Sequence, residues 1–195
     1  MGTLPSTNAF TVRLATMEDV PGLEKLIRDS VHVLQARDYS WEQRDAALGS
    51  VFGVDTQLIR DGTYFVVESG SEIVACGGWS RRRTLFGGDH RTGREDTLLD
   101  PATEAARIRA FFVRPGWERR GIGSLIMRTC EAAARAERFH RLELGSTLTG
   151  VALYQAHGFV ADEEIEVPLS AGLPLRVVRM SKTLEPVTAA TGISE

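Results

Sequence analysis

Apolar and polar residues alternate along several short segments of the chain, while in others the apolar residues recur every three or four positions. Residues 10–14 show the two-residue period of a strand with one buried face. Between residues 20 and 34 the apolar side chains form one helical stripe. The same patterns predict further strands at 64–68, 73–79, 108–113, 141–144, 159–167 and 175–184, and further helices at 40–49, 124–136 and 149–157.

Residues at the ends of these segments support the assignment. Thr16 and Asp19 fit a capping box ahead of the first helix, and the turn around Gly70 joins strands 64–68 and 73–79 into a hairpin. The other expected helix ends are Ser40 and Gly49 for the second helix, and Thr149 and Gly158 for the last one.

The order of the elements is that of a mixed α+β sheet with helices on both faces. One domain is expected over residues 10–185, between flexible tails at 1–9 and 186–195. Residues 81–104 show no period, and a loop of this length within a compact domain is usually functional or mobile.

The overall composition argues against several classes of protein. The 195 residues carry a formal net charge of −3 at pH 7, which argues against a general nucleic-acid binder. No apolar run approaches the roughly 20 residues that cross a bilayer, and the N-terminus does not resemble a signal peptide. Gly2 with Ser6 matches the short myristoylation pattern, which we take as coincidence. Cys76 and Cys130 lack metal-ligand spacing, so we expect reduced thiols, no metal and a cytoplasmic location.

Residues 105–136 carry the most chemical information. A strand that ends at Val113 is followed by a turn with two arginines and two glycines, and then by an Ala-rich amphipathic helix. A helix start leaves backbone N–H groups unpaired at the positive end of its dipole, and glycine lets a phosphate approach them. The segment therefore predicts a site for a phosphorylated cofactor.

Further features accompany this turn. Val113-x-Pro115 precedes the Gly-x-Gly pair, and Leu153-Tyr154-Gln155-Ala156-His157-Gly158-Phe159 follows further along the chain. The combination resembles the Gcn5-related N-acetyltransferases, the GNAT superfamily, over roughly residues 10–184. The resemblance implies the GNAT fold, in which a mixed, mostly antiparallel sheet is splayed at its central strands and has helices on both faces.

The function implied by the resemblance is direct transfer of an acetyl group from acetyl-CoA to a primary amine of a small molecule or peptide. No acyl-enzyme is expected, and neither cysteine acts as a nucleophile. The resemblance implies no nucleic-acid or membrane partner. It does imply a homodimer, which is common in the family.

The resemblance also assigns roles to matching positions. The backbone of Phe112 and Val113 is expected to contact the pantetheine arm, in the gap between strands 108–113 and 141–144. Tyr154 is expected to hydrogen-bond the sulfur and to protonate the departing thiolate. The backbone N–H groups expected to hold the pyrophosphate are those of Arg119, Arg120, Gly121, Ile122, Gly123 and Ser124.

Several positions depart from the family pattern. Glu118 stands where most relatives have Arg or Gln, and Thr147 stands at a position that is asparagine in relatives. Arg107 and Arg109 stand where many relatives keep a glutamate that acts as a base. The proton acceptor is then expected to be Glu104, Glu143, a carboxylate of the 81–104 loop or a water chain.

Strand alternation predicts that Arg107 and Arg109 share one face with Phe111 and Val113. Two interpretations of the arginines stay open. They bind an anionic group of the acceptor, which favours an acceptor with a carboxylate or phosphate, or they are solvated or paired with Glu143 across the sheet.

The missing glutamate leaves a second function open, a non-catalytic acyl-CoA-binding sensor or interaction module on the same fold. Other polar and aromatic residues have ordinary structural explanations beside functional ones, as surface, packing or helix-end residues. These are Arg81, Arg82, Arg83, Tyr39, Trp41, His90 and His157.

Overall fold

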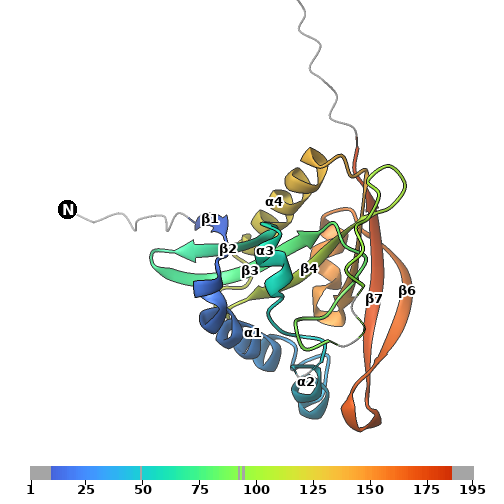
Figure 1. Ribbon diagram of the computed structural model, residues 1–195. Coiled ribbons are helices and arrows are strands. Elements are labelled where there is room, and N and C mark those ends of the chain that lie inside the picture. Colours follow the sequence, from blue (N-terminus) through green and yellow to red (C-terminus); the bar gives the residue numbers. More distant parts are fainter. Residues whose placement is uncertain (1–9, 49, 92, 94, 186–195) are drawn as a thin grey trace, which may run out of the picture.

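Seven strands and five α-helices form the part of the chain that the structure, a computed structural model, describes: residues 10–48, 50–91, 93 and 95–185 (Figure 1). The helices are α1 (Val20–Leu34), α2 (Trp41–Leu48), α3 (Thr56–Arg60), α4 (Ile122–Ala136) and α5 (Val151–Ala156). The strands are β1 (Phe10–Leu14), β2 (Tyr64–Ser69), β3 (Glu72–Ser80), β4 (Ala106–Val113), β5 (Arg141–Thr147), β6 (Val160–Pro168) and β7 (Pro174–Thr183). The expected tails, with Gly2 and Ser6, and the expected helix end at Gly49 lie outside the described residues.

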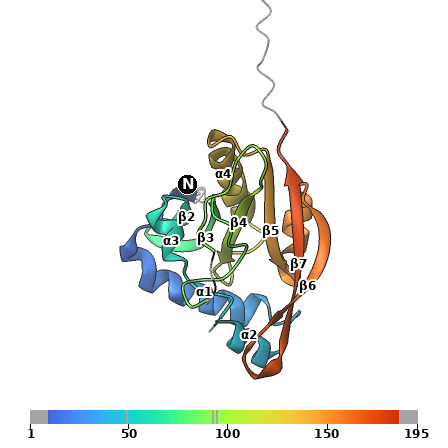
Figure 2. The same ribbon diagram turned by 45° about the vertical axis from the view of Figure 1, so that its right-hand side comes forward.

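All seven strands belong to one sheet in the order β1-β2-β3-β4-β5-β7-β6, and Figure 2 shows those from β2 to β6 in this order across the view. Neighbouring strands are antiparallel except for β4 and β5, which are parallel. These two strands pair only where Ala106 meets Leu142 and Arg107 meets Glu143. Beyond that point they separate, so the expected mixed sheet with splayed central strands is confirmed.

Helices cover both faces of the sheet, as predicted. In the view of Figure 1, α1 and α2 lie below the sheet and α4 lies above it. Ile126 and Met127 of α4 pack in one apolar core with Trp79, whereas Leu23 of α1 packs in a second core with Tyr64. Burial of such a side chain contributes about 1.5–3 kcal/mol, so these two cores fix how β4 and β5 sit between the layers.

A β-bulge interrupts β4 at its centre. Arg109 pairs with Gly78 and Phe112 with Cys76, so β4 holds one more residue than β3 between these pairs. Ala110 lies within this interval and has a φ of 55°, a left-handed conformation that costs a non-glycine residue about 1 kcal/mol or more.

The bulge reverses the alternation of side chains along β4. Phe111 and Val113 pack on the α4 side with Ile108, while Ala110 and Phe112 pack on the α1 side. The prediction that Arg107 and Arg109 share a face with Phe111 and Val113 is therefore wrong, because it assumed an unbroken two-residue period.

The ends of the helices agree only in part with the sequence prediction. Asp19 accepts a hydrogen bond from the Thr16 backbone N–H at 2.8 Å, in the predicted capping box, although a 3-10 turn (Met17–Asp19) precedes α1. Ser40 Oγ accepts from the Gln43 N–H at 3.2 Å, as expected of an N-cap. Thr149 does not cap α5, because Thr147 Oγ1 accepts the Gly150 N–H instead, at 3.2 Å.

The segment 81–104 forms an irregular two-stranded arm. Backbone hydrogen bonds join Arg83 to Thr97 at 3.1 Å and Leu99 to Arg81 at 2.8 Å. The tip of the arm folds back toward the segment ahead of α3, where the Asp89 N–H donates to the Val54 carbonyl at 3.0 Å. This contact places residues 85–88 over the splay between β4 and β5.

Candidate active site

The start of α4 presents backbone N–H groups to a groove. The first helical hydrogen bond runs from the Leu125 N–H to the Gly121 carbonyl at 2.9 Å, so the N–H groups of residues 122–124 have no partner within the helix. Arg119 and Gly121 both have positive φ, 63° and 79°. Successive N–H groups in such a turn form a concave anion-binding site, which the helix dipole strengthens.

This groove has a volume of about 800 Å³ and extends from the α4 turn to the end of β4 and the side of α1. We call it the turn groove. It is lined by seven of the eight residues expected to bind the cofactor: Phe112, Val113, Arg119, Gly121, Ile122, Gly123 and Ser124. Arg120 does not line it, and its guanidinium lies 4.7 Å from the centre of the Trp117 ring and donates to the Gly116 carbonyl at 3.0 Å. The role expected of its backbone N–H stays a prediction.

Close packing explains why a glycine stands at position 123, the second glycine of the Gly-x-Gly pair. A Cβ atom at this position would come within 3.0 Å of the Leu153 side chain on α5. The glycine therefore lets α5 lie close against the start of α4, and this contact brings the next residue of α5, Tyr154, toward the splay.

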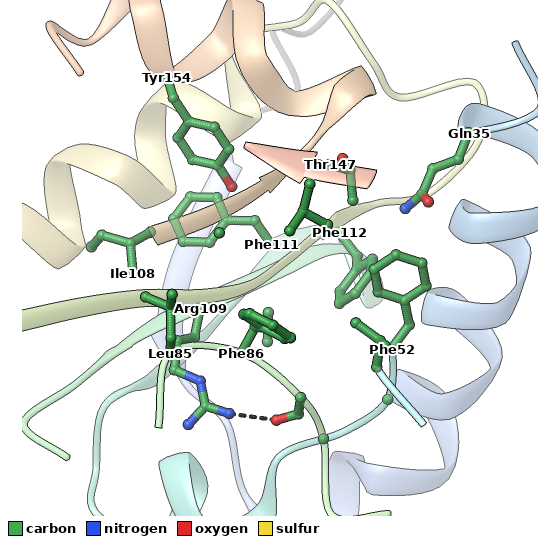
Figure 3. A pocket seen from close by; sticks show the side chains of 17 residues that line it. Gln35, Phe52, Leu85, Phe86, Ile108, Arg109, Phe111, Phe112, Thr147 and Tyr154 are labelled. Carbon is green, nitrogen blue, oxygen red and sulfur yellow. Dashed lines mark hydrogen bonds between the residues drawn. The ribbon is translucent and has the colours of Figure 1, made fainter. Parts of the chain in front are cut away.

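A second, smaller hollow lies at the splay, with a volume of about 80 Å³ (Figure 3). We call it the splay pocket. It is lined by segments 51–53, 85–88 and 108–112, and by Gln35, Gly145, Thr147, Tyr154 and Val177. Four residues line both hollows, namely Gln35, Phe111, Phe112 and Thr147. The turn groove and the splay pocket therefore meet where β4 and β5 part.

Tyr154 lies beside this junction. Its ring packs against Phe111 and Phe159, with centroid distances of 6.1 and 5.8 Å. In Figure 3 its hydroxyl oxygen points from α5 toward the strands of the splay. Burial raises the pKa of Tyr154 above its ordinary value of 10.0, so the phenol keeps its proton at neutral pH.

Both arginines of β4 are paired with carboxylates. The Arg109 guanidinium is 2% exposed and forms an ion pair with Asp55 at 2.8 Å, and it also donates to the Gly87 carbonyl. Arg107 pairs with Glu143, which Arg179 also contacts. The interpretation of pairing with Glu143 is confirmed for Arg107, whereas the partner of Arg109 is Asp55, a residue that the sequence did not single out.

The carboxylates expected to act as proton acceptors do not line the splay pocket. Glu143 is held by Arg107 and Arg179, and Glu104 pairs with Arg83 at 2.8 Å. Both line a separate surface hollow. Among loop carboxylates, Asp89 accepts from the Thr56 N–H at 3.0 Å at the start of α3. Within the described lining of the splay pocket there is no carboxylate and no histidine.

The remaining sequence candidates have structural partners. Arg81 pairs with Glu137 and Arg82 with Asp61, at 2.6 and 2.7 Å, which ties the 81–104 arm to the domain. The Ser124 hydroxyl lies 2.9 Å from the imidazole Nε2 of His157, whose pKa is lowered chiefly by burial.

Tyr39 is buried and its hydroxyl donates to the Arg176 carbonyl at 2.6 Å, whereas Trp41 is exposed and stacks on His32. His90 lines a hollow beside α1 rather than the splay pocket. In the described ranges no three His, Cys, Asp or Glu residues gather as a metal site. No helix of those ranges is long and apolar enough to span a membrane.

Three residues of the splay pocket were missed from the sequence. Gln35 follows the last residue of α1, and Phe52 and Phe86 lie in irregular segments. Their Cα positions depend on contacts between distant segments, such as that between Asp89 and Val54, so no local pattern could have identified them.

The sequence was compared with models of known protein families and with curated proteins. A family model described as the acetyltransferase (GNAT) family matches residues 28–159 of the chain. A comparison with curated proteins gave no match.

Several solved structures are similar over at least 90% of the chain, and three of them are described here. A GCN5-related N-acetyltransferase from Rhodopseudomonas palustris is 19% identical, with a TM-score of 0.65 over 94% of this chain and 100% of that one. The PaiA N-acetyltransferase from Thermoplasma acidophilum, solved with coenzyme A, is 12% identical, with a TM-score of 0.62 over 90% and 99% of the two chains. YncA from Salmonella typhimurium, solved with its cofactor acetyl-CoA, is 16% identical, with a TM-score of 0.59 over 94% and 99%. These likenesses confirm the predicted fold.

Proposed function

The chain belongs to the acetyltransferase (GNAT) family, and from this we propose that it transfers an acetyl group from acetyl-CoA directly to a primary amine of a small molecule or peptide. The observation that carries the proposal is the junction of the two hollows at the splay, with Tyr154 beside it. The turn groove would hold the donor, and the splay pocket would admit the amine from the other side.

The residues of the turn groove fit acetyl-CoA. The N–H groups at the start of α4 would bind the pyrophosphate, as helix N-termini do in other phosphate sites. Beyond Arg107, β4 has no pairing with β5, so the backbone of Phe112 and Val113 borders the splay and can bond to the pantetheine amides. PaiA and YncA, which share this fold, were solved with coenzyme A and acetyl-CoA, and this likeness supports the same donor here.

Bound acetyl-CoA would supply an acyl carbon that is activated as a thioester. In the transfer a bond forms between the amine nitrogen and that carbon, the carbon–sulfur bond breaks, the amine loses a proton and the thiolate gains one. Tyr154, which is protonated and buried, is the group that we assign to the departing sulfur.

The bulge on β4 offers a donor for the developing oxyanion. The Ala110 carbonyl accepts a hydrogen bond from the Tyr64 hydroxyl at 3.2 Å. Because the carbonyl and the N–H of a trans peptide point in opposite directions, the Phe111 N–H points away from Tyr64. We assign this N–H to the oxyanion, as a preorganised donor at the reacting carbon.

Release of the CoA thiol, measured with a broad panel of primary amines, tests the proposal. Enzyme-dependent thiol release matched by acetylated amine in the mass spectrum is the expected result. Saturable binding of acetyl-CoA without turnover on any amine would instead support a non-catalytic acyl-CoA sensor. That alternative is motivated by the described lining of the splay pocket, which holds no carboxylate.

A further inference from the structure

Ten of the 17 residues that line the splay pocket are aromatic or aliphatic, although slightly more than half of its exposed surface is polar. Phe52 and Phe112 come from the α1 side and Phe86 from the tip of the 81–104 arm. Leu85, which Figure 3 shows beside Phe86, and Val51 also belong to this apolar part of the lining. These rings and aliphatic side chains form an apolar part of the pocket that suits the apolar body of a ligand, and the polar groups beside it would fix the ligand's orientation.

The pocket offers no unpaired charge to an acceptor. In the described lining, the ionisable side chains are Arg109 and Tyr154. Arg109 is committed to Asp55 and to the Gly87 carbonyl, and Figure 3 shows its guanidinium pointing away from Tyr154 toward the arm. A carboxylate or a second ammonium group that entered this pocket would lose its hydration without gaining a counter-charge.

One polar atom at the junction has no partner. The Gln35 side chain is 6% exposed, and its Oε1 atom accepts no hydrogen bond from the described residues. Gln35 lines both hollows, so its side-chain amide lies beside the place where the donor and the acceptor would meet. An unpaired buried carbonyl costs about 1–3 kcal/mol, and the N–H of an incoming amine would satisfy it.

Phe86 limits the size of the pocket. Its ring covers Gly145 on β5, where a Cβ atom would come within 3.1 Å of the ring. The Arg91 guanidinium lies 4.3 Å from the ring centre. The resulting volume of about 80 Å³ is smaller than the roughly 150 Å³ that holds a benzene ring in an engineered cavity.

We infer that the acceptor is a small primary amine with an uncharged, apolar body, which Phe52, Phe86 and Phe112 hold and whose nitrogen Gln35 orients. The inference rests on the proposed acetyl transfer and names its substrate class. It replaces the expectation of an anionic acceptor, because the arginines that motivated that expectation are paired within the protein.

Three amines with the same four-carbon chain test the effect of charge: butylamine, 4-aminobutanoate and 1,4-diaminobutane. We expect kcat/KM for butylamine to exceed that for each of the other two by about tenfold or more, because a buried unpaired charge is costly. An equal or higher kcat/KM for either charged analogue overturns the inference and leaves acetyl transfer intact. If none of these amines and no larger aliphatic or aromatic amine is acetylated although acetyl-CoA binds, acetyl transfer itself fails, and the inference with it.

Two variants test the named residues. Gln35→Leu should lower kcat/KM for butylamine by about tenfold, whereas Gln155→Leu, an exposed control on α5, should leave it unchanged. Phe86→Ala should raise kcat/KM for phenethylamine relative to butylamine by about tenfold, and Leu98→Ala, an exposed control on the same arm, should leave that ratio unchanged. Wild-type values in Gln35→Leu or Phe86→Ala would remove the role of that residue.

Discussion

Three polar residues are buried at the splay, namely Tyr154, Arg109 and Gln35. Burial has a different consequence for each of them. Burial raises the pKa of Tyr154 and keeps its proton available. Arg109 is neutralised by Asp55 and thereby holds the arm through the Gly87 carbonyl. Gln35 carries no charge, and its Oε1 is unpaired among the described residues. The environment of Tyr154, as well as its motif, therefore supports the role that we propose for it.

Replacement of Tyr154 by phenylalanine tests the assigned proton donor. We expect kcat to fall by about 100-fold or more, the usual contribution of a general acid, while the Kd for acetyl-CoA stays within about twofold. Steady-state thiol release and calorimetry measure these two quantities. Tyr39→Phe is the matched control and should mainly lower stability, because it removes the hydrogen bonds to Arg176 and Leu148. A wild-type kcat in Tyr154→Phe would exclude the donor role.

The pH dependence of kcat/KM follows from the same lining. Without a carboxylate or histidine in the described pocket, the rate should follow the fraction of neutral amine, whose pKa is about 10.4. Log kcat/KM should therefore rise with a slope near one from about pH 6 to about pH 9. The raised pKa of Tyr154 predicts no falling limb in this range, since the phenol stays protonated. A plateau that begins near pH 7 would reveal a general base.

At the scale of elements, β4 carries the feature that decides the geometry of the site. Its bulge turns Phe112 toward α1 and Phe111 toward α4, so that both rings border the splay. Strong periodicity predicted the β2–β3 hairpin and α4 correctly. The bulge could not be predicted, because it depends on a left-handed backbone conformation at Ala110. Non-glycine residues rarely adopt this conformation without tertiary support. The five-residue helix α3 is too short to show a helical period.

Ala110→Gly tests the strain in this bulge. Glycine normally costs about 0.5–1 kcal/mol within a strand, but at a φ of 55° it should relieve the left-handed strain. We expect the free energy of unfolding to stay equal or to rise by up to about 1 kcal/mol in urea titrations. Ala106→Gly on the same strand, which is buried and regular, should lower it. If Ala110→Gly lowered the free energy of unfolding as much as Ala106→Gly does, Ala110 would not be strained.

At the scale of the whole molecule, the two faces of the sheet contribute different halves of the site. In the proposed function, the α4 side would provide the N–H groups for the donor and Tyr154, and the α1 side with the 81–104 arm would enclose much of the space for the acceptor. Local motifs named the residues that line the proposed donor half, because these lie in one continuous segment with α5 beside it, and their roles stay predictions. The residues of the acceptor half could not be named in this way, because Gln35, Phe52 and Phe86 meet only through the tertiary fold.

Binding of the donor should stabilise the folded chain. At about 100 times its Kd, a ligand of the native state adds about 2.7 kcal/mol, which for a domain of this size corresponds to a rise in Tm of about 5–10 °C. Thermal unfolding with and without acetyl-CoA measures the shift. Acetate at the same concentration is the control and should give no shift, because it lacks the pyrophosphate and pantetheine groups that the turn groove would bind.

A crystal structure of the protein with CoA bound tests the central claim most directly. The account predicts that the pyrophosphate lies against the N–H groups of residues 119–124, that the pantetheine arm follows Phe112 and Val113, and that the sulfur lies within hydrogen-bonding distance of the Tyr154 hydroxyl. A CoA molecule bound outside the turn groove, or one whose sulfur points away from the junction with the splay pocket, would contradict it.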